Sequence, residues 1–66
     1  MKGIVQWFNQ LRGYGLIKSE DGTDVFVHRS ALPYGTRIHE KDHVEYRILL
    51  SHQGPKAINI KKITSL

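Results

Sequence analysis

Cysteine is absent from this 66-residue chain, and proline and long apolar runs are scarce. Without cysteine there is no disulfide framework and no cysteine-ligated metal site, so a small fold depends on its core alone. The longest apolar run, Ile48-Leu49-Leu50, is far shorter than the roughly 20 residues that span a bilayer. The start, Met1-Lys2-Gly3-Ile4, lacks the apolar segment of a secretory signal. We therefore expect one domain over residues 1–66, located in the cytoplasm and without a membrane partner.

Acidic residues are also the minority: Lys and Arg number 10 against 6 Asp and Glu, which gives a formal net charge of +4. A positive excess suits a polyanionic partner such as nucleic acid, although many unrelated basic proteins share it. Glu20, Asp21, Asp24 and Glu40 fall in turns or at strand ends, where no pattern makes them converge on a catalytic site. The composition therefore favours a binding protein over an enzyme.

The histidines do not form a metal-binding pattern. His39 and His43 are four residues apart and would share one face of a helix, but Pro33, Gly35 and the strand that follows disfavour a helix there. We expect neither a metal site nor a cofactor.

Alternating apolar residues predict five strands, near residues 2–9, 13–19, 24–28, 43–50 and 56–63. Asp21-Gly22 is typical of a hairpin turn between the second and third strands. Residues 29–42 are irregular and admit one helical turn at Ser30-Ala31-Leu32. Five short antiparallel strands without a helical period predict an all-β fold, a small barrel in which closure removes the exposed edges.

Strand periodicity divides the second and third predicted strands into two faces. The face expected to form the core carries Ile17, Val25 and Val27, and the opposite face carries Tyr14, Leu16, Phe26 and His28. Rings on a water-facing surface, with Trp7, Arg12 and Lys18 nearby, are typical of a platform on which single-stranded nucleic acid stacks.

The position of Trp7 is ambiguous, whereas we expect Phe8 and Tyr46 to have structural roles. Trp7-Phe8 interrupts the alternation of the first strand, so parity does not place Trp7, and we expect Phe8 in the core or at its rim. Tyr46 shares the parity of Val44 and Ile48, which predicts that all three point into the core.

Five segments, in this order and at this spacing, resemble the bacterial cold-shock protein family: Gly3-Ile4-Val5-Gln6-Trp7-Phe8-Asn9, Arg12-Gly13-Tyr14-Gly15-Leu16-Ile17, Asp24-Val25-Phe26-Val27-His28, Ser30-Ala31-Leu32 and Gly54-Pro55. The resemblance implies a five-stranded antiparallel OB-type barrel that binds single-stranded RNA and DNA on its first three strands, with little sequence preference. It also implies an RNA chaperone that affects transcription termination and translation.

The same resemblance assigns roles by position. Trp7 matches the exposed tryptophan of the family, Tyr14 the first aromatic of its Lys-Gly-Phe-Gly-Phe motif, and Phe26 and His28 the exposed residues of its Val-Phe-Val-His motif. The residues expected to bind nucleic acid are Trp7, Asn9, Arg12, Tyr14, Leu16, Lys18, Phe26, His28, Arg29, Tyr34 and Lys56.

The chain departs from the family pattern at several of these positions. Leu16 replaces the second phenylalanine of the first motif, and Arg29 replaces the aromatic residue that commonly follows the histidine. The loop after Leu32 is about two residues short, with Tyr34 as the substitute for its usual aromatic residue. Because Ile4 and Gln6 stand where lysines are frequent, we expect less positive charge on the first strand as well as less stacking area.

Two other binding modules share parts of this pattern. An SH3-like barrel also binds through an aromatic groove, but the interleaved Arg12, Lys18 and Arg29 favour an anionic ligand. Arg-Gly-Tyr-Gly resembles a signature of the RNA-recognition motif, whose fold needs two helices and the opposite order of aromatic strands. We expect single-stranded RNA and DNA as partners, no obligate protein partner, and a monomer.

Overall fold

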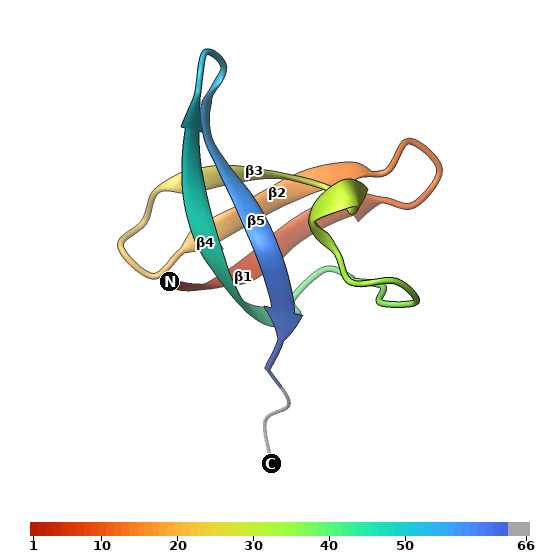
Figure 1. Ribbon diagram of the computed structural model, residues 1–66. Helices are drawn as coiled ribbons and strands as arrows, with labels where there is room; N and C mark the ends of the chain where they lie inside the picture. The colour runs from red at the N-terminus through yellow and green to blue at the C-terminus, as the bar shows by residue number, and fades with distance from the viewer. Residues whose placement is uncertain (64–66) are drawn as a thin grey trace.

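The computed structural model describes residues 1–63, in which five strands and one short helical turn follow one another. The strands are β1 (Lys2–Asn9), β2 (Tyr14–Ser19), β3 (Asp24–His28), β4 (His43–Ser51) and β5 (Gly54–Lys62), and the 3₁₀ turn η1 (Arg29–Ala31) follows β3 (Figure 1). The predicted strands therefore exist, with bounds that differ by two residues at most. No helix among residues 1–63 is long and apolar enough to cross a membrane.

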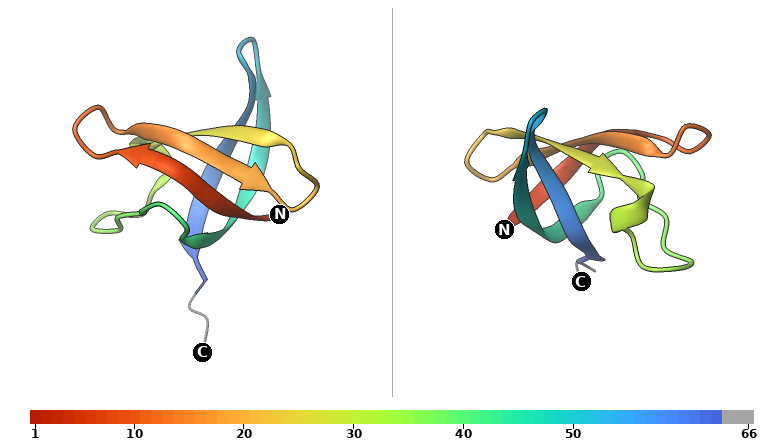
Figure 2. Two further views of the ribbon diagram at one scale, coloured as in Figure 1. Left: turned by 180° about the vertical axis from the view of Figure 1, so that it is seen from behind. Right: turned by 45° about the horizontal axis from the view of Figure 1, so that its top comes forward.

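The strands close into a barrel in the order β1-β2-β3-β5-β4, which confirms the predicted fold class. The β1, β2 and β3 strands form one curved antiparallel layer, and the β4–β5 hairpin crosses it (Figures 1 and 2). The pairing of β3 with β5 is parallel, whereas the sequence pattern suggested antiparallel strands throughout. A parallel pair needs a long connection between its strands, and here η1, the irregular segment and β4 supply it.

The core is a single cluster of nine buried apolar residues: Val5, Ile17, Val25, Val27, Ile38, Val44, Tyr46, Ala57 and Ile60. The expected core face of β2 and β3 is confirmed, as is the inward position of Tyr46. Phe8 is half-buried and packs against this cluster, as predicted for a rim residue. Burial of alternate side chains leaves the other side of β1–β3 facing solvent.

Ile48 is a correction to the predicted core. It was expected inside with Val44 and Tyr46, yet 37% of its surface is exposed. The reason is that β1 pairs with β4 only at residues 43–45 of β4, so the following residues of β4 run past the closed part of the barrel. The projecting end of the β4–β5 hairpin is visible in Figure 1.

The start of β5 also differs from its prediction. Gly54 and Pro55 fall between the strands predicted over residues 43–50 and 56–63, but both belong to β5, opposite Ser51 and Leu50. Gly54 adopts a positive φ of 105° directly after the two-residue loop His52-Gln53, a conformation that glycine reaches at little cost.

Candidate nucleic-acid interface

The outer side of the β1–β3 layer carries two rows of cross-strand neighbours. In one row Trp7 lies opposite Leu16, Leu16 opposite Phe26, and Phe26 opposite Lys56 of β5. In the other row Asn9 lies opposite Tyr14, and Tyr14 opposite His28. The structure therefore brings seven of the eleven expected binding residues together on adjacent strands of one surface.

The rings of this surface form a continuous apolar cluster. The Trp7 and Tyr14 ring centroids are 5.8 Å apart with planes at 77°, and those of Tyr14 and Phe26 are 6.0 Å apart with planes at 27°. Trp7 and Phe26 remain 43% and 40% exposed, although each could have added to a thin core. We call Trp7, Tyr14, Leu16, Phe26 and His28 the aromatic face.

A β-bulge turns Trp7 toward this face. The register of β1 against β2 shifts between Val5 and Trp7, so Gln6 and Trp7 are both exposed and the alternation then resumes with the half-buried Phe8. Gly15 makes the close β1–β2 approach possible, because a Cβ there would overlap the Trp7 carbonyl oxygen and the Phe8 ring. The outward position of Trp7 thus depends on local irregularity rather than on strand parity.

His28 is held in one orientation by the turn that follows it. Its Nδ1 accepts a hydrogen bond from the backbone N–H of Ser30 at 3.1 Å, and the Ser30 hydroxyl lies 2.9 Å from the same nitrogen. Because an N–H can only donate, Nδ1 is the acceptor in the bond from Ser30, and Nε2 is the ring nitrogen left to carry a proton. His28 therefore offers an N–H donor, rather than an acceptor, to a ligand on the aromatic face.

Asn9 has a structural part in the β1–β2 turn. Its Oδ1 accepts hydrogen bonds from the N–H groups of Leu11 and Arg12, at 3.0 and 2.9 Å. Gly13 then takes a positive φ of 77°, and its carbonyl oxygen accepts a hydrogen bond from the backbone N–H of Arg29 at 2.7 Å. The Arg29 side chain lies against Gly13, where an added Cβ would be 2.6 Å from Arg29 Cδ. These contacts place Arg12 and Arg29 at the same end of the aromatic face.

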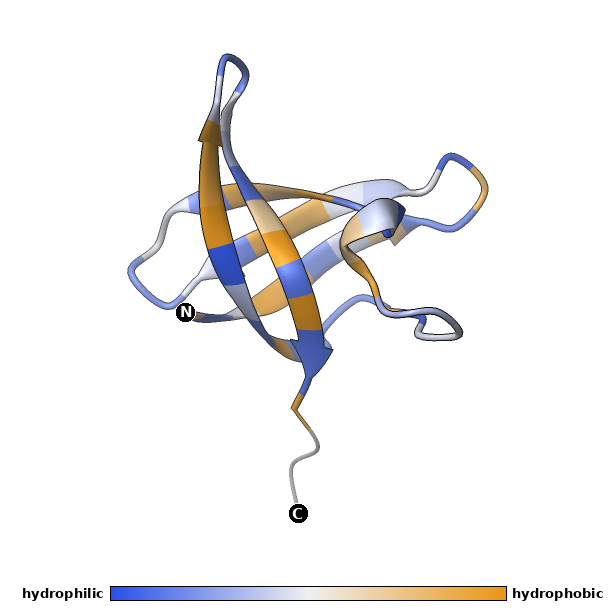
Figure 3. Ribbon diagram, in the orientation of Figure 1, coloured by the Kyte–Doolittle hydropathy of each residue, from blue (hydrophilic) through white to orange (hydrophobic). Residues whose placement is uncertain are grey.

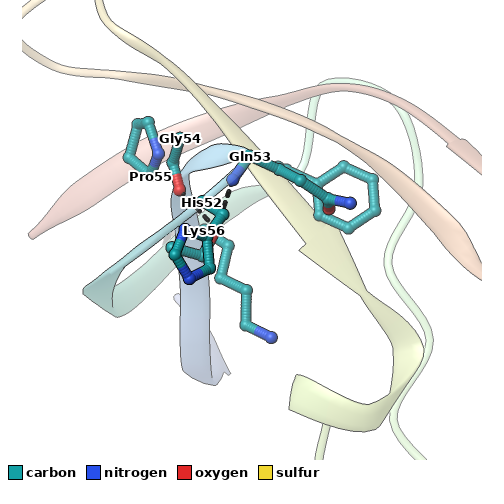
Figure 4. A pocket seen from close by; sticks show the side chains of 7 residues that line it. His52, Gln53, Gly54, Pro55 and Lys56 are labelled. Atoms are coloured by element: carbon teal, nitrogen blue, oxygen red, sulfur yellow. Dashed lines mark hydrogen bonds between the residues drawn. The ribbon is translucent and has the colours of Figure 1, made fainter.

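Two lysines flank the face elsewhere. Lys18 lies at the far end of β2, where its ammonium is 3.7 Å from the Asp24 carboxylate and both side chains are half-exposed. Lys56 lies beside Phe26 and lines a hollow of about 330 Å³ with residues of the β4–β5 loop (Figure 4). Asp24 compensates part of the Lys18 charge, which makes Lys56 and the two arginines the stronger candidates for phosphate contacts.

The hollow beside Phe26 includes residues that the sequence analysis missed. His52 and Gln53 line it together with Ser51, Gly54 and Pro55. They lie near Phe26 only because β5 pairs with β3 in parallel. Gly54-Pro55 belonged to the recognised motif, so it was the one local signal that pointed to this loop.

Tyr34 is the expected residue that the structure does not bring into the cluster. It is fully exposed in the segment after η1, and among residues 1–63 its ring makes no ring–ring contact with the aromatic face. Its binding role stays a prediction that depends on how this segment meets a ligand.

The aromatic face has uncharged rings at its centre and four cationic side chains around it: Arg12, Arg29, Lys18 and Lys56. At the β2–β3 turn, a hydrogen bond from Thr23 N–H lowers the pKa of Asp21, which keeps this fully exposed carboxylate ionised. Within the described part of the chain, no three His, Asp or Glu side chains converge as metal ligands. The arrangement suits a flat, anionic, extended ligand.

Comparison with known proteins points in the same direction. Residues 1–63 match the model of the 'Cold-shock' DNA-binding domain. The chain is 43% identical over 65 residues to the cold shock-like protein CspC of Bacillus cereus, a match that covers 96% of this chain and all of that protein. It is 40% identical to the cold shock protein CspB of Bacillus caldolyticus (94% of this chain, 97% of the relative) and 38% identical to the major cold shock protein of Streptococcus pyogenes serotype M1 (94% and 96%).

Proposed function

The chain belongs to the cold-shock domain family, and on that premise we propose that it binds single-stranded RNA and DNA on the aromatic face with little sequence preference. The family consists of nucleic-acid-binding proteins that are not enzymes, which confirms the expectation of a non-enzyme.

The observation that carries this proposal is the side-by-side arrangement of Trp7, Tyr14 and Phe26 on an exposed sheet surface. Every nucleobase has a flat π-face, so rings of this kind bind single strands of any sequence, at about 1–3 kcal/mol per stacked base. Three or four stacked bases outweigh a moderate cost of ordering the strand. We expect each protein to cover about six or seven nucleotides, within the usual site size of such barrels.

The charges around the aromatic face support a path for the phosphates. Arg12 and Arg29 lie at one end of it, Lys18 at the other, and Lys56 along the β5 side. Bases stacked on the rings would therefore leave their phosphates near cations at the rim. Within the face itself the side chains of Trp7, Tyr14 and His28 each carry one donor group, and this small number is in keeping with weak sequence preference.

A protein of this kind opens RNA structure by mass action. The chain has no phosphate-binding loop for nucleotide hydrolysis, so it shifts a hairpin equilibrium only by binding the open strand. We propose an ATP-independent RNA chaperone that acts as a cytoplasmic monomer and thereby affects transcription termination and translation. A fluorophore-labelled weak hairpin should open as protein is added, whereas a stable hairpin should stay closed, and a weak hairpin that stays closed at saturation contradicts the chaperone role.

Binding itself is tested through Trp7, the single tryptophan of the chain. Heptanucleotides of RNA and of DNA should each quench its fluorescence, and their affinities should fall as salt is raised, because phosphate contacts release counterions. An absence of binding at low salt contradicts the proposal and favours instead a protein-interaction module that uses the same aromatic face. The ratio of the two affinities measures the preference for RNA or DNA.

A further inference from the structure

A third row of outward side chains adjoins the aromatic face. In this row Ile4 lies opposite Lys18 of β2 on one side and opposite His43 of β4 on the other. Lys18 is two residues beyond Leu16 on β2, so both side chains lie on the outer surface and their Cα atoms are about 7 Å apart. The outer surface of the sheet therefore continues from the aromatic face toward the start of β1.

The surface is hollowed at this third row. A hollow of about 610 Å³ lies over the first half of β1 and is bounded by the end of β2, the start of β4 and Ile63. It is larger than the 330 Å³ hollow beside Phe26, and its volume is within the roughly 300–1,000 Å³ usual for sites of small organic ligands. The left view of Figure 2 shows the start of β1 beside the end of β2, close to the N-terminus. The hollow has room for a nucleobase.

The centre of the hollow is apolar. Figure 3 shows a hydrophobic segment in the first half of β1. Within it Val5 is buried in the core, whereas Ile4 is 40% exposed, nearly as much as Trp7 at 43%. At the rim, the half-buried Ile63 donates its N–H to the His43 carbonyl oxygen at 3.0 Å. Ile4 thus presents an apolar surface to solvent without adding to the core.

Polar and cationic groups surround this apolar centre. The exposed Lys2 lies opposite Glu45, yet within residues 1–63 its ammonium forms no ion pair. Gln6 is exposed at the β1 bulge, and its carboxamide can both donate and accept hydrogen bonds. Of the described residues that line the hollow, Lys2 and Lys18 carry ammonium groups and only Glu20 carries a carboxylate. The lining therefore favours a ligand that combines a flat apolar part with a negative charge.

We propose that this hollow binds one further nucleotide of a single strand that already lies on the aromatic face. The inference rests on the proposed function, because the strand reaches the hollow from the neighbouring row of that face. The base lies against Ile4 and Ile63, its edge meets the Gln6 carboxamide, and its phosphate lies near Lys2 and Lys18. The covered length then increases from about seven nucleotides to about eight.

This nucleotide contributes less than a fully stacked base. Isoleucine has no π-face, so the base gains apolar contact without a stack, and we expect a gain in affinity of about threefold to tenfold. So small a contribution is sufficient because the rest of the strand holds the nucleotide beside the hollow, where its effective concentration is high. One added phosphate contact steepens the log–log salt dependence by about 0.7.

The test compares a heptanucleotide with a nonanucleotide, both DNA strands of one repeated base, by Trp7 fluorescence. A seven-nucleotide site has about three registers on the longer strand, which alone raises affinity about threefold. The wild type should gain roughly tenfold in total, because the hollow is then filled as well. Ile4→Ser should bind the heptanucleotide like the wild type and gain only the register factor on the nonanucleotide.

Ile48→Ser is the matched control. Ile48 is 37% exposed, a fraction similar to that of Ile4, and it lies on β4 outside both the hollow and the aromatic face. This variant should gain as much from the longer strand as the wild type. Lys2→Gln should lower the magnitude of the nonanucleotide salt slope by about 0.7 and leave the heptanucleotide slope unchanged.

Methyl chemical shifts locate the added nucleotide without any substitution. The Ile4 and Ile63 methyl signals of the wild type should move with the nonanucleotide and stay in place with the heptanucleotide. The proposal is overturned if these signals do not respond to the nonanucleotide, or if Ile4→Ser folds and gains as much as the wild type. Should Ile4→Ser unfold, the methyl shifts decide. A wild type that does not bind the heptanucleotide contradicts the proposed function itself, and this inference with it.

Discussion

Replacing Leu16 with phenylalanine should tighten the binding of single strands. Leu16 is the position between Trp7 on β1 and Phe26 on β3 in the same cross-strand row, and it alone among these three lacks a ring. Directly opposite side chains on neighbouring strands have Cβ atoms about 5 Å apart. A phenyl group at position 16 would therefore join the Trp7 and Phe26 rings into one uninterrupted stacking surface.

The size of the effect follows from what Leu16 already contributes. A full base–aromatic stack contributes about 1–3 kcal/mol, but the half-buried leucine side chain already gives a base some apolar contact. We expect a net gain near the lower end, about 1 kcal/mol, or roughly fivefold in affinity. The substitution adds no charge, so the slope of log affinity against log salt should not change. The side chain points outward, so the free energy of unfolding should change by less than about 1 kcal/mol.

The assay is a Trp7 fluorescence titration with one heptanucleotide at several salt concentrations, together with thermal unfolding of each variant. Leu50→Phe is the matched control, because it adds the same ring to an exposed leucine on β4, outside the aromatic face. The reasoning is refuted if Leu16→Phe folds normally and binds no tighter than the wild type. Equal tightening by Leu50→Phe would also refute it, because general hydrophobicity would then explain the gain.

Three further predictions concern charge, core and pH. Arg29→Phe should reduce the magnitude of the log–log salt slope by about 0.7, the contribution of one phosphate contact on a single strand, and an unchanged slope places Arg29 away from the phosphates. Tyr46→Phe should leave the free energy of unfolding unchanged or raise it by about 1 kcal/mol, because no group among residues 1–63 hydrogen-bonds its buried hydroxyl; clear destabilisation in denaturant titrations would contradict this. Partial burial raises the pKa of Asp42, but the His39 N–H and the Lys62 ammonium, 2.8 and 3.3 Å from its Oδ2, lower that pKa by more. The folded-state pKa thus lies below the unfolded one, and the resulting stabilisation is complete above the ordinary value of 3.8 and is lost as the pH falls through the folded value. Asp42→Asn should therefore destabilise the fold by up to about 1 kcal/mol near neutral pH, with a difference that shrinks in acid, and a difference independent of pH would contradict the ion pair.

The two faces of β2 and β3 were predictable because both strands pair without a bulge. In an unbroken strand the period of two fixes each side chain once one is placed, so Ile17 and Val25 had to be inside when Tyr14 and Phe26 were outside. Trp7 was different, since the bulge that turns it outward has no periodic signature. Its position came only from the family resemblance.

Contacts between distant segments were not predictable from local patterns. Ile38 is fully buried although it lies in a segment without strand or helix periodicity, and nothing in its neighbourhood marked it as core. The parallel pairing of β3 with β5 brings His52 and Gln53 beside Phe26, but which strands become neighbours depends on closure of the whole barrel. Ile48 had the inward parity and is nevertheless exposed, because parity does not say where the barrel ends.

The decisive measurement on the aromatic face is the affinity of Phe26→Ala for a heptanucleotide, compared with that of Leu49→Ala. The two wild-type side chains are exposed to similar extents, 40% and 47%, but only Phe26 lies on the aromatic face. Phe26→Ala should lose about 1–3 kcal/mol of binding free energy while its thermal unfolding remains cooperative, and Leu49→Ala should bind like the wild type. A Phe26→Ala protein that folds and binds with wild-type affinity, or a larger loss for Leu49→Ala, would show that nucleic acid does not bind on this face.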